Sequence, residues 1–213
     1  IRYQPIMWGY KNINGERKKK PIQRTILHAG TYKALGIRPW IYETSNEFVY
    51  GLKLLVEAVN KLTNTKLIIR IRDNQECTVS SLKILLPKSS NYEIKTSGKF
   101  LNDLNAADLL VSYSSTTIEE ALYARKPVGL FGGSNRYRHL PGSTAPPSRT
   151  ARSAVYHLSN ENLIPMLTSI LDVHASNPLS DQELDGYTWP GNVPGREEFI
   201  NHLLDSDKTA FYE

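Results

Sequence analysis

The residues best suited to chemistry are four consecutive hydroxyl side chains: Ser114, Ser115, Thr116 and Thr117. They lie between an apolar segment, residues 108–112, which is typical of a buried strand, and a segment with helical spacing that runs to residue 125. Backbone amides at the start of a helix, together with the helix dipole, favour a negative charge. Thr116 and Glu119 also have the spacing of a capping box, but four hydroxyl residues exceed what one cap requires. The turn is therefore predicted to bind a phosphate group.

Glu120 comes directly after Glu119, near the start of the same expected helix. A carboxylate can accept hydrogen bonds from a pair of ribose hydroxyls, which would make Glu120 a ligand of a bound nucleotide. The alternative is an acidic residue that only stabilises the helix dipole.

A second candidate turn follows the apolar residues 25–29. Its glycine, hydroxyl and two cations are Gly30, Thr31, Lys33 and, further on, Arg38. A glycine lets a ligand approach the backbone closely, and the two cations could pair with a diphosphate. The turn matches neither a Walker loop nor GxGxxG, so Lys33 and Arg38 could equally be ordinary loop cations. His28, at the end of the apolar segment, is interpreted as a packed side chain rather than a catalyst.

A third candidate turn follows the apolar residues 127–131. Two glycines precede an amide side chain and two guanidinium groups here: Gly132, Gly133, Asn135, Arg136 and Arg138. Amides and cations at the end of a strand could form an anion or sugar pocket. A flexible surface loop with scattered charges is the alternative.

Short apolar runs alternate with helical patterns, and these elements must position the three turns. Strands are expected at residues 25–29, 66–72, 92–95, 108–112 and 127–131, and helices at residues 44–64, 79–86, 100–107, 116–125 and 161–174. Thr44 and Glu47 predict a capping box at the start of the first helix. The alternation predicts a Rossmann-like α/β fold, an open parallel sheet with helices on both faces. Because ligands of such sheets bind at the carboxyl ends of the strands, the three turns are expected to meet.

The chain of 213 residues is expected to contain one domain with two flanking segments. Residues 1–21 mix turn residues with a basic run and are predicted to be a lead-in segment or linker. The α/β domain is expected over residues 22–175. Residues 176–213 would form a C-terminal extension with a short helix near residues 196–204.

The net charge of +5, from 26 Lys and Arg against 21 Asp and Glu, is compatible with anionic ligands. The surplus is concentrated in Arg17–Lys20, which is interpreted as a solvated linker and not as a nucleic-acid-binding surface. The sequence has no CxxC pair, no HExxH motif and no clustered histidines, so no metal site is expected. The absence of a GxSxG elbow likewise argues against a Ser-His-Asp hydrolase.

A cytoplasmic location is expected. Cys77 is the only cysteine, which fits a reducing compartment. No apolar run is long enough to cross a bilayer, and the first twenty residues lack the apolar core of a signal peptide. The chain opens on Ile1 and is expected to be a piece of a longer protein.

Residues 107–128 resemble the donor-binding C-terminal half of GT-B glycosyltransferases, and bacterial surface-polysaccharide transferases in particular. The resemblance rests on an acidic residue opening a strand, the small-residue turn, Glu120-Ala121, and Pro127-Val128 seven residues later. It extends more loosely over residues 22–175. It implies that Glu120 binds the donor ribose, that residues 114–117 face the diphosphate, and that a nucleotide sugar is bound without a metal or other cofactor.

Two positions depart from this pattern. Tyr113 stands near the place of an acidic residue common in retaining members, and Arg125 replaces a common glycine. These departures favour an inverting or phosphotransfer relative. The resemblance also implies that an N-terminal acceptor-binding half is absent from this chain, so the catalytic residues stay unknown.

Two other functions remain open. The Tyr-Ser-Ser turn is also similar to that of teichoic acid glycerophosphate polymerases, so a CDP-glycerol-type phosphotransferase is the first alternative. The second is a non-catalytic module in which Arg17–Lys20 contacts an anionic polymer or the inner face of a membrane. The acidic and histidine constellation expected of a nucleotide-sugar epimerase is missing.

Overall fold

The computed structural model describes residues 23–30, 42–72, 78–175 and 177–188, with residues 195, 197, 198, 200 and 201. Its strands are β1 (Arg24–Ala29), β2 (Thr65–Arg70), β3 (Tyr92–Lys95), β4 (Leu109–Ser112), β5 (Val128–Leu130) and β6 (Val155–His157). Its helices are α1 (Ser45–Asn60), α2 (Val79–Leu85), α3 (Phe100–Ala106), α4 (Thr117–Tyr123), α5 (Leu163–His174) and α6 (Asp181–Leu184).

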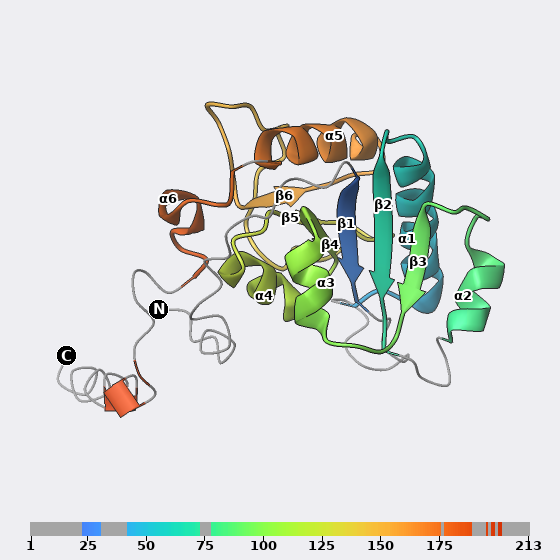
Figure 1. The fold of residues 1–213 in the computed structure, drawn as a ribbon, viewed down its shortest axis with the longest axis horizontal. Helices are drawn as coiled ribbons and strands as arrows, with labels where there is room; N and C mark the ends of the chain where they lie inside the picture. The colour runs from blue at the N-terminus through green and yellow to red at the C-terminus, as the bar shows by residue number, and fades with distance from the viewer. Residues whose placement is uncertain are drawn as a thin grey trace.

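The six strands form one sheet in the order β3-β2-β1-β4-β5-β6, and every pair is parallel (Figure 1). Along the chain, β2 and then β3 lie on one side of β1, whereas β4, β5 and β6 follow on its other side. β1 and β4 are therefore the point at which the direction of strand addition reverses. The predicted open parallel α/β sheet is confirmed.

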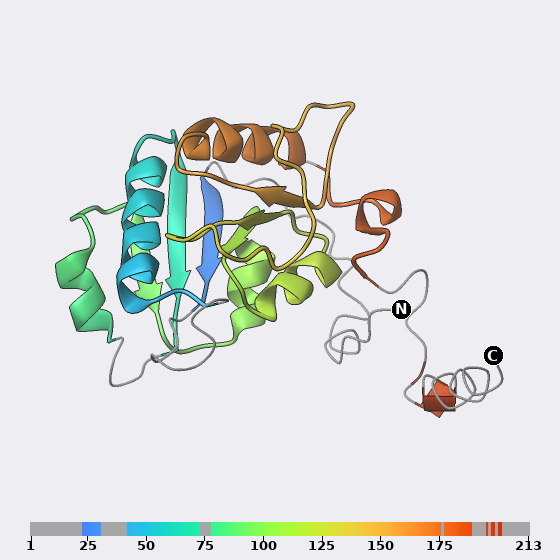
Figure 2. The same ribbon diagram turned by 180° about the vertical axis from the view of Figure 1, so that it is seen from behind.

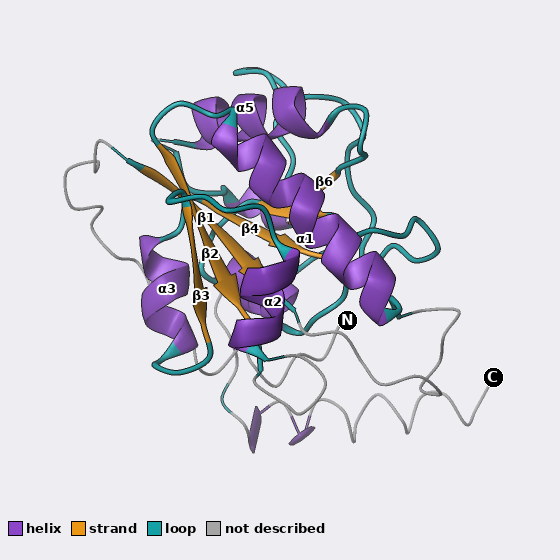
Figure 3. Cartoon of the chain, turned by 90° about the vertical axis from the view of Figure 1, so that its right-hand side faces the viewer, coloured by secondary structure: helices purple, strands orange, loops and turns teal. Residues whose placement is uncertain are grey.

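Helices cover both faces of the sheet, as predicted. One face packs against α1, α2 and α5, with Ile26, Ile69 and Val111 pointing into that core. The other face packs against α3, α4 and α6, with Leu27 and Leu110 pointing into it. Figures 1 and 2 show these two faces from opposite sides, and Figure 3 shows α3 on the other side of the sheet from α1 and α5. Strands buried on both faces explain the continuous apolar runs of the sequence.

The predicted capping box at the start of α1 is confirmed. The Thr44 hydroxyl accepts from the backbone of Glu47 at 3.3 Å, and the Glu47 carboxylate accepts from the Thr44 backbone at 2.8 Å. The helix ends at Asn60 rather than at residue 64, because residues 61–64 form the turn into β2. Asn64 in that turn has a positive φ of 50°, which a continuing helix would not allow.

Two short elements, β6 and α6, were not predicted from the sequence. β6 has three residues, and α6 has four within a stretch rich in proline and glycine. The predicted lead-in segment, residues 1–21, and most of the helix predicted near residues 196–204 lie outside the described residues. In the part of the chain that is described, no helix has the length and apolar character needed to cross a membrane.

Candidate functional site

The carboxyl ends of β1 and β4 form the candidate site. The two strands pair directly, with Ile26 opposite Leu109 and His28 opposite Val111. The Ser112 hydroxyl donates to the Ala29 carbonyl at 2.6 Å and joins the two strand ends. In open α/β sheets with this strand order, ligands bind in the crevice where the order reverses. Two of the predicted turns, at Gly30 and at residues 114–117, begin there.

Gly30 offers a test of this crevice. A Cβ atom added at Gly30 would lie 3.7 Å from the Cε1 atom of His28, its nearest neighbour in the described part of the chain, so these residues leave room for alanine. We expect Gly30→Ala to leave the unfolding temperature unchanged. It should weaken nucleotide binding if the backbone at Gly30 approaches a phosphate, and calorimetric titration would measure this. An unchanged affinity would remove Gly30 from the site.

The hydroxyl turn adopts a different local structure from the predicted capping box. Thr116 has helical backbone angles, φ −62° and ψ −13°, and its side chain caps nothing. Ser115 takes that role, because its hydroxyl accepts from the backbone of Thr117 at 3.3 Å. The Glu119 carboxylate turns away and contacts His139 Nε2 at 2.8 Å. The capping box predicted for Thr116 and Glu119 is therefore wrong.

One hydroxyl of this turn has an unusual environment. The Oγ1 atom of Thr117 is buried and has no hydrogen-bond partner among the described residues. Buried polar atoms in native proteins almost always find a partner, in the protein, in water or in a ligand. Glu120 lies in the first turn of α4 and is half-buried. Its role as a ribose ligand stays a prediction.

A cavity of about 270 Å³ opens at the carboxyl ends of β4, β5 and β6. Three residues predicted for the third turn contribute to its wall: Gly132, Asn135 and Arg138. Tyr113 and Tyr137 also line it, with their rings edge to face at 6.4 Å between centroids. A cavity that combines aromatic rings, an amide and a cation suits a small polar ring.

The other two predicted residues of that turn face α1. The backbone amide of Gly133 donates to Glu43 Oε1 at 2.6 Å. The guanidinium of Arg136 pairs with the Glu47 carboxylate and donates to the Tyr42 carbonyl at 3.0 Å. This pairing is the main reason that the pKa of Glu47 is lowered to about 2. Neither Gly133 nor Arg136 lines the cavity.

Several residues of this region were missed by the sequence analysis. His157, Ser159 and Asn162 reach the cavity from β6 and the segment after it, and β6 itself was not predicted. Glu43 was missed because nothing in its neighbourhood along the chain marks it. His28 behaves as interpreted: it is buried, it packs on Phe48, and burial lowers its pKa to about 4, which keeps the imidazole neutral at pH 7.

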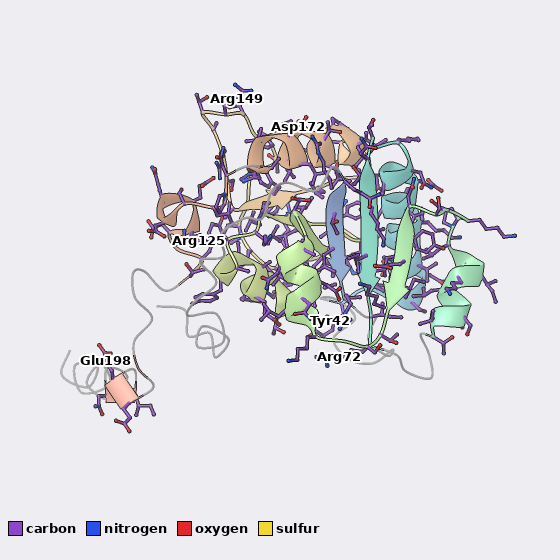
Figure 4. The ribbon with its side chains drawn as sticks, in the orientation of Figure 1. Tyr42, Arg72, Arg125, Arg149, Asp172 and Glu198 are labelled. Atoms are coloured by element: carbon purple, nitrogen blue, oxygen red, sulfur yellow. The ribbon has the colours of Figure 1, made fainter. Side chains whose placement is uncertain are left out.

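Three predicted ligands, Thr31, Lys33 and Arg38, lie outside the described residues, as does the basic run Arg17–Lys20. Figure 4 shows Tyr42 and Arg72, which border segments outside the described residues, at the edge where the arrows of β1 and β2 end. Within the described part of the chain, no group of three or more His, Cys, Asp or Glu side chains could hold a metal ion.

No protein-family model matches the chain, and no curated protein matches it either. Solved structures with a similar chain trace include glycosyltransferases, UDP-N-acetylglucosamine 2-epimerases and a wall teichoic acid polymerase. A putative 2-epimerase from Listeria monocytogenes is 15% identical, with 99% of this chain and 48% of that chain covered and a TM-score of 0.47. The wall teichoic acid polymerase TagF is 14% identical, with 97% and 48% covered and a TM-score of 0.49. The spinosyn forosaminyltransferase SpnP is 17% identical, with 88% and 44% covered and a TM-score of 0.49.

The chain spans about half the length of these solved structures. They belong to the GT-B class that residues 107–128 resemble. At these identities and TM-scores, the likeness concerns the chain trace alone.

Proposed function

We propose that the chain is the donor-binding half of a GT-B glycosyltransferase and that it binds a nucleoside-diphosphate sugar. The observation that supports this function is the pairing of β1 with β4, the strands that lead into Gly30 and the hydroxyl turn, where the strand order reverses. The cavity beside them adds room for a sugar ring.

In this proposal each part of the donor has its own contacts. The diphosphate lies between Gly30 and residues 114–117, where backbone amides favour negative charge. Lys33 and Arg38 are proposed to add positive charge. Glu120 accepts from the ribose hydroxyls, and the cavity lined by Tyr113 and Asn135 receives the sugar. During transfer, such amides and cations would stabilise the departing nucleoside diphosphate.

The acceptor follows from the sequence resemblance, and the location from the single cysteine, Cys77, and the basic run Arg17–Lys20. We propose a surface glycan as acceptor, a second half of the enzyme that binds it, and action in the cytoplasm at the inner face of the membrane. Arg17–Lys20 would supply the membrane contact, which neutralising these four residues would test by vesicle binding at low and high salt.

Calorimetric titration with UDP, CDP, GDP, ADP and CMP tests the proposed donor site. We expect one nucleoside diphosphate to bind best and Glu120→Ala to weaken it about ten-fold or more, because a hydrogen-bonded carboxylate is lost. Glu57→Ala is the matched control, since Glu57 is exposed on α1. Equal affinities for wild type and Glu120→Ala would contradict the ribose assignment. A preference for CDP-glycerol over every nucleotide sugar would instead indicate glycerophosphate transfer.

A further inference from the structure

The start of α1 holds the segment that follows β5, residues 131–138, which we call the β5 loop. Two carboxylates at the start of α1, those of Glu43 and Glu47, contact this loop. Glu43 Oε1 accepts from the Gly133 amide at 2.6 Å, and Glu47 Oε2 lies 2.7 Å from a guanidinium nitrogen of Arg136. Glu43 precedes the cap of α1, and Glu47 belongs to its first turn. The β5 loop is thus fixed at two points to one helix start.

The backbone of the β5 loop packs directly against the backbone of α1. A Cβ atom added at Gly133 would lie 2.7 Å from the Glu47 carbonyl carbon, and one added at Gly51 would lie 2.6 Å from the Gly133 nitrogen. At Gly132 an added Cβ atom would lie 2.5 Å from the ring of Tyr113 and 2.8 Å from the Glu43 carboxyl carbon. The Glu43 carboxyl group therefore sits against Gly132 and close to Tyr113, two residues that line the cavity.

The two carboxyl groups respond differently to pH. Burial raises the pKa of Glu43 to about 7, with a further rise from the charge of Glu47, while the Gly133 amide and Arg136 act in the opposite direction. Among the described residues, Tyr113 also faces Glu43; burial raises the pKa of Tyr113, which stays neutral. Glu47 stays ionised because its pKa is about 2. Near neutral pH, Glu43 therefore changes its charge while Glu47 and Arg136 keep theirs.

We infer that Glu43 is a positioning residue of the donor site, which fixes the β5 loop through the Gly133 amide when its carboxyl group is ionised. A hydrogen bond to a carboxylate is roughly twice as strong as one to a neutral group. Protonation therefore loosens the loop that contributes Gly132 and Asn135 to the cavity wall. The consequence for ligand binding rests on the proposed function, whereas the titration of the contact does not.

The contact itself can be followed by the amide resonance of Gly133 in 1H–15N spectra between pH 5.5 and 8.5. We expect this resonance to shift with a midpoint near pH 7 in the wild type and to stay constant in Glu43→Gln. Glu57→Gln, an exposed glutamate of α1, is the control and should titrate like the wild type. A Gly133 resonance that is constant in the wild type, or that still titrates in Glu43→Gln, would overturn the inference.

The effect on the site is measured by titrating the best-binding nucleoside diphosphate at pH 6 and pH 8. We expect about five-fold tighter binding at pH 8 in the wild type, relative to the same ratio in Glu43→Gln. The nucleotide's own phosphate titrates equally in both experiments, so the comparison removes its contribution. Equal ratios in the two proteins would overturn the positioning role. Absence of any diphosphate binding would contradict the proposed donor site alone, and the Gly133 resonance would still decide whether Glu43 holds the loop.

Discussion

Replacing Gly133 by alanine is expected to lower the free energy of unfolding by about 1–3 kcal/mol and to abolish nucleotide binding. The added methyl group would lie 2.7 Å from the Glu47 carbonyl carbon, which belongs to the backbone of α1 and cannot rotate away. Relief requires the β5 loop to leave the helix, and this movement breaks the bond between the Gly133 amide and Glu43. Urea unfolding and calorimetric titration would measure the two effects.

Gly30→Ala is the matched control for stability, because an added methyl group at Gly30 comes no closer than 3.7 Å to the described residues. Its free energy of unfolding should equal that of the wild type. A Gly133→Ala protein that unfolds like the wild type would show that the loop can move away from α1 without cost. The inference that α1 positions the cavity wall through the β5 loop would then be wrong.

Replacing Glu47 by alanine is expected to cost about 0.5–2 kcal/mol of stability at pH 7. The change leaves the bond from the backbone amide of residue 47 to the Thr44 hydroxyl in place. It removes the carboxylate half of the capping box, which accepts from the Thr44 backbone, and the partly exposed ion pair with Arg136, whose contribution is screened by solvent. The loss at the helix start should be accompanied by weaker ordering of the β5 loop. Thermal and urea unfolding would report the stability, with Glu57→Ala as the exposed control on the same helix.

The pH dependence of this loss has a definite sign. The pKa of Glu47 is lowered in the fold from 4.5 to about 2, mainly by the hydrogen bond from Arg136. A lowered carboxyl pKa contributes stability that is complete above pH 4.5 and is lost as the pH falls toward 2. The difference between wild type and Glu47→Ala should therefore be largest above pH 5 and should shrink steadily in acid. A difference that is the same at pH 3 and pH 7 would mean that packing, rather than charge, explains it.

The sequence predicted the elements that have a clear apolar pattern, because this pattern is set by burial in the sheet. β3 has the predicted bounds, Tyr92–Lys95, and β1 differs by a single residue. β6, Val155–His157, was missed because its short apolar run is broken by His157, whereas β5, which also has three residues, lies within a run of five residues without a polar side chain. α6 has four residues and gains its order from tertiary contacts, such as the buried Leu184.

The candidate site was predictable where it depends on topology. Parallel strands end at one edge, so the turns after β1, β4 and β5 could be expected to meet. The contacts between α1 and the β5 loop were not predictable, since 90 positions separate Glu43 from Gly133 and 89 separate Glu47 from Arg136. Single-sequence patterns describe neighbours along the chain, whereas these pairs are created by the fold.

The structure also explains two positions of the GT-B resemblance in physical terms. Asp108, the acidic residue before β4, accepts a hydrogen bond from the backbone amide of Thr25 at 2.9 Å. This bond gives an amide near the start of β1 its partner. Arg125, which stands where a glycine is common, has a positive φ of 55°. That conformation favours glycine. Its guanidinium donates to the Leu179 carbonyl at 2.8 Å and pairs with Asp181, which ties the end of α4 to the start of α6.

The central place of β1 has a consequence for synthesis of the protein. β1 is made before the other strands, yet one of its two neighbours, β4, comes more than 80 residues later, since 83 positions separate Thr25 from its partner Asp108. At roughly 5–20 residues per second, a ribosome needs several seconds to cover that distance. During this time β1, whose last four residues end up buried, has one unpaired edge, which is a template for association with other chains. Nascent chains that stop before β4 should therefore need chaperones, and those that extend past it should not.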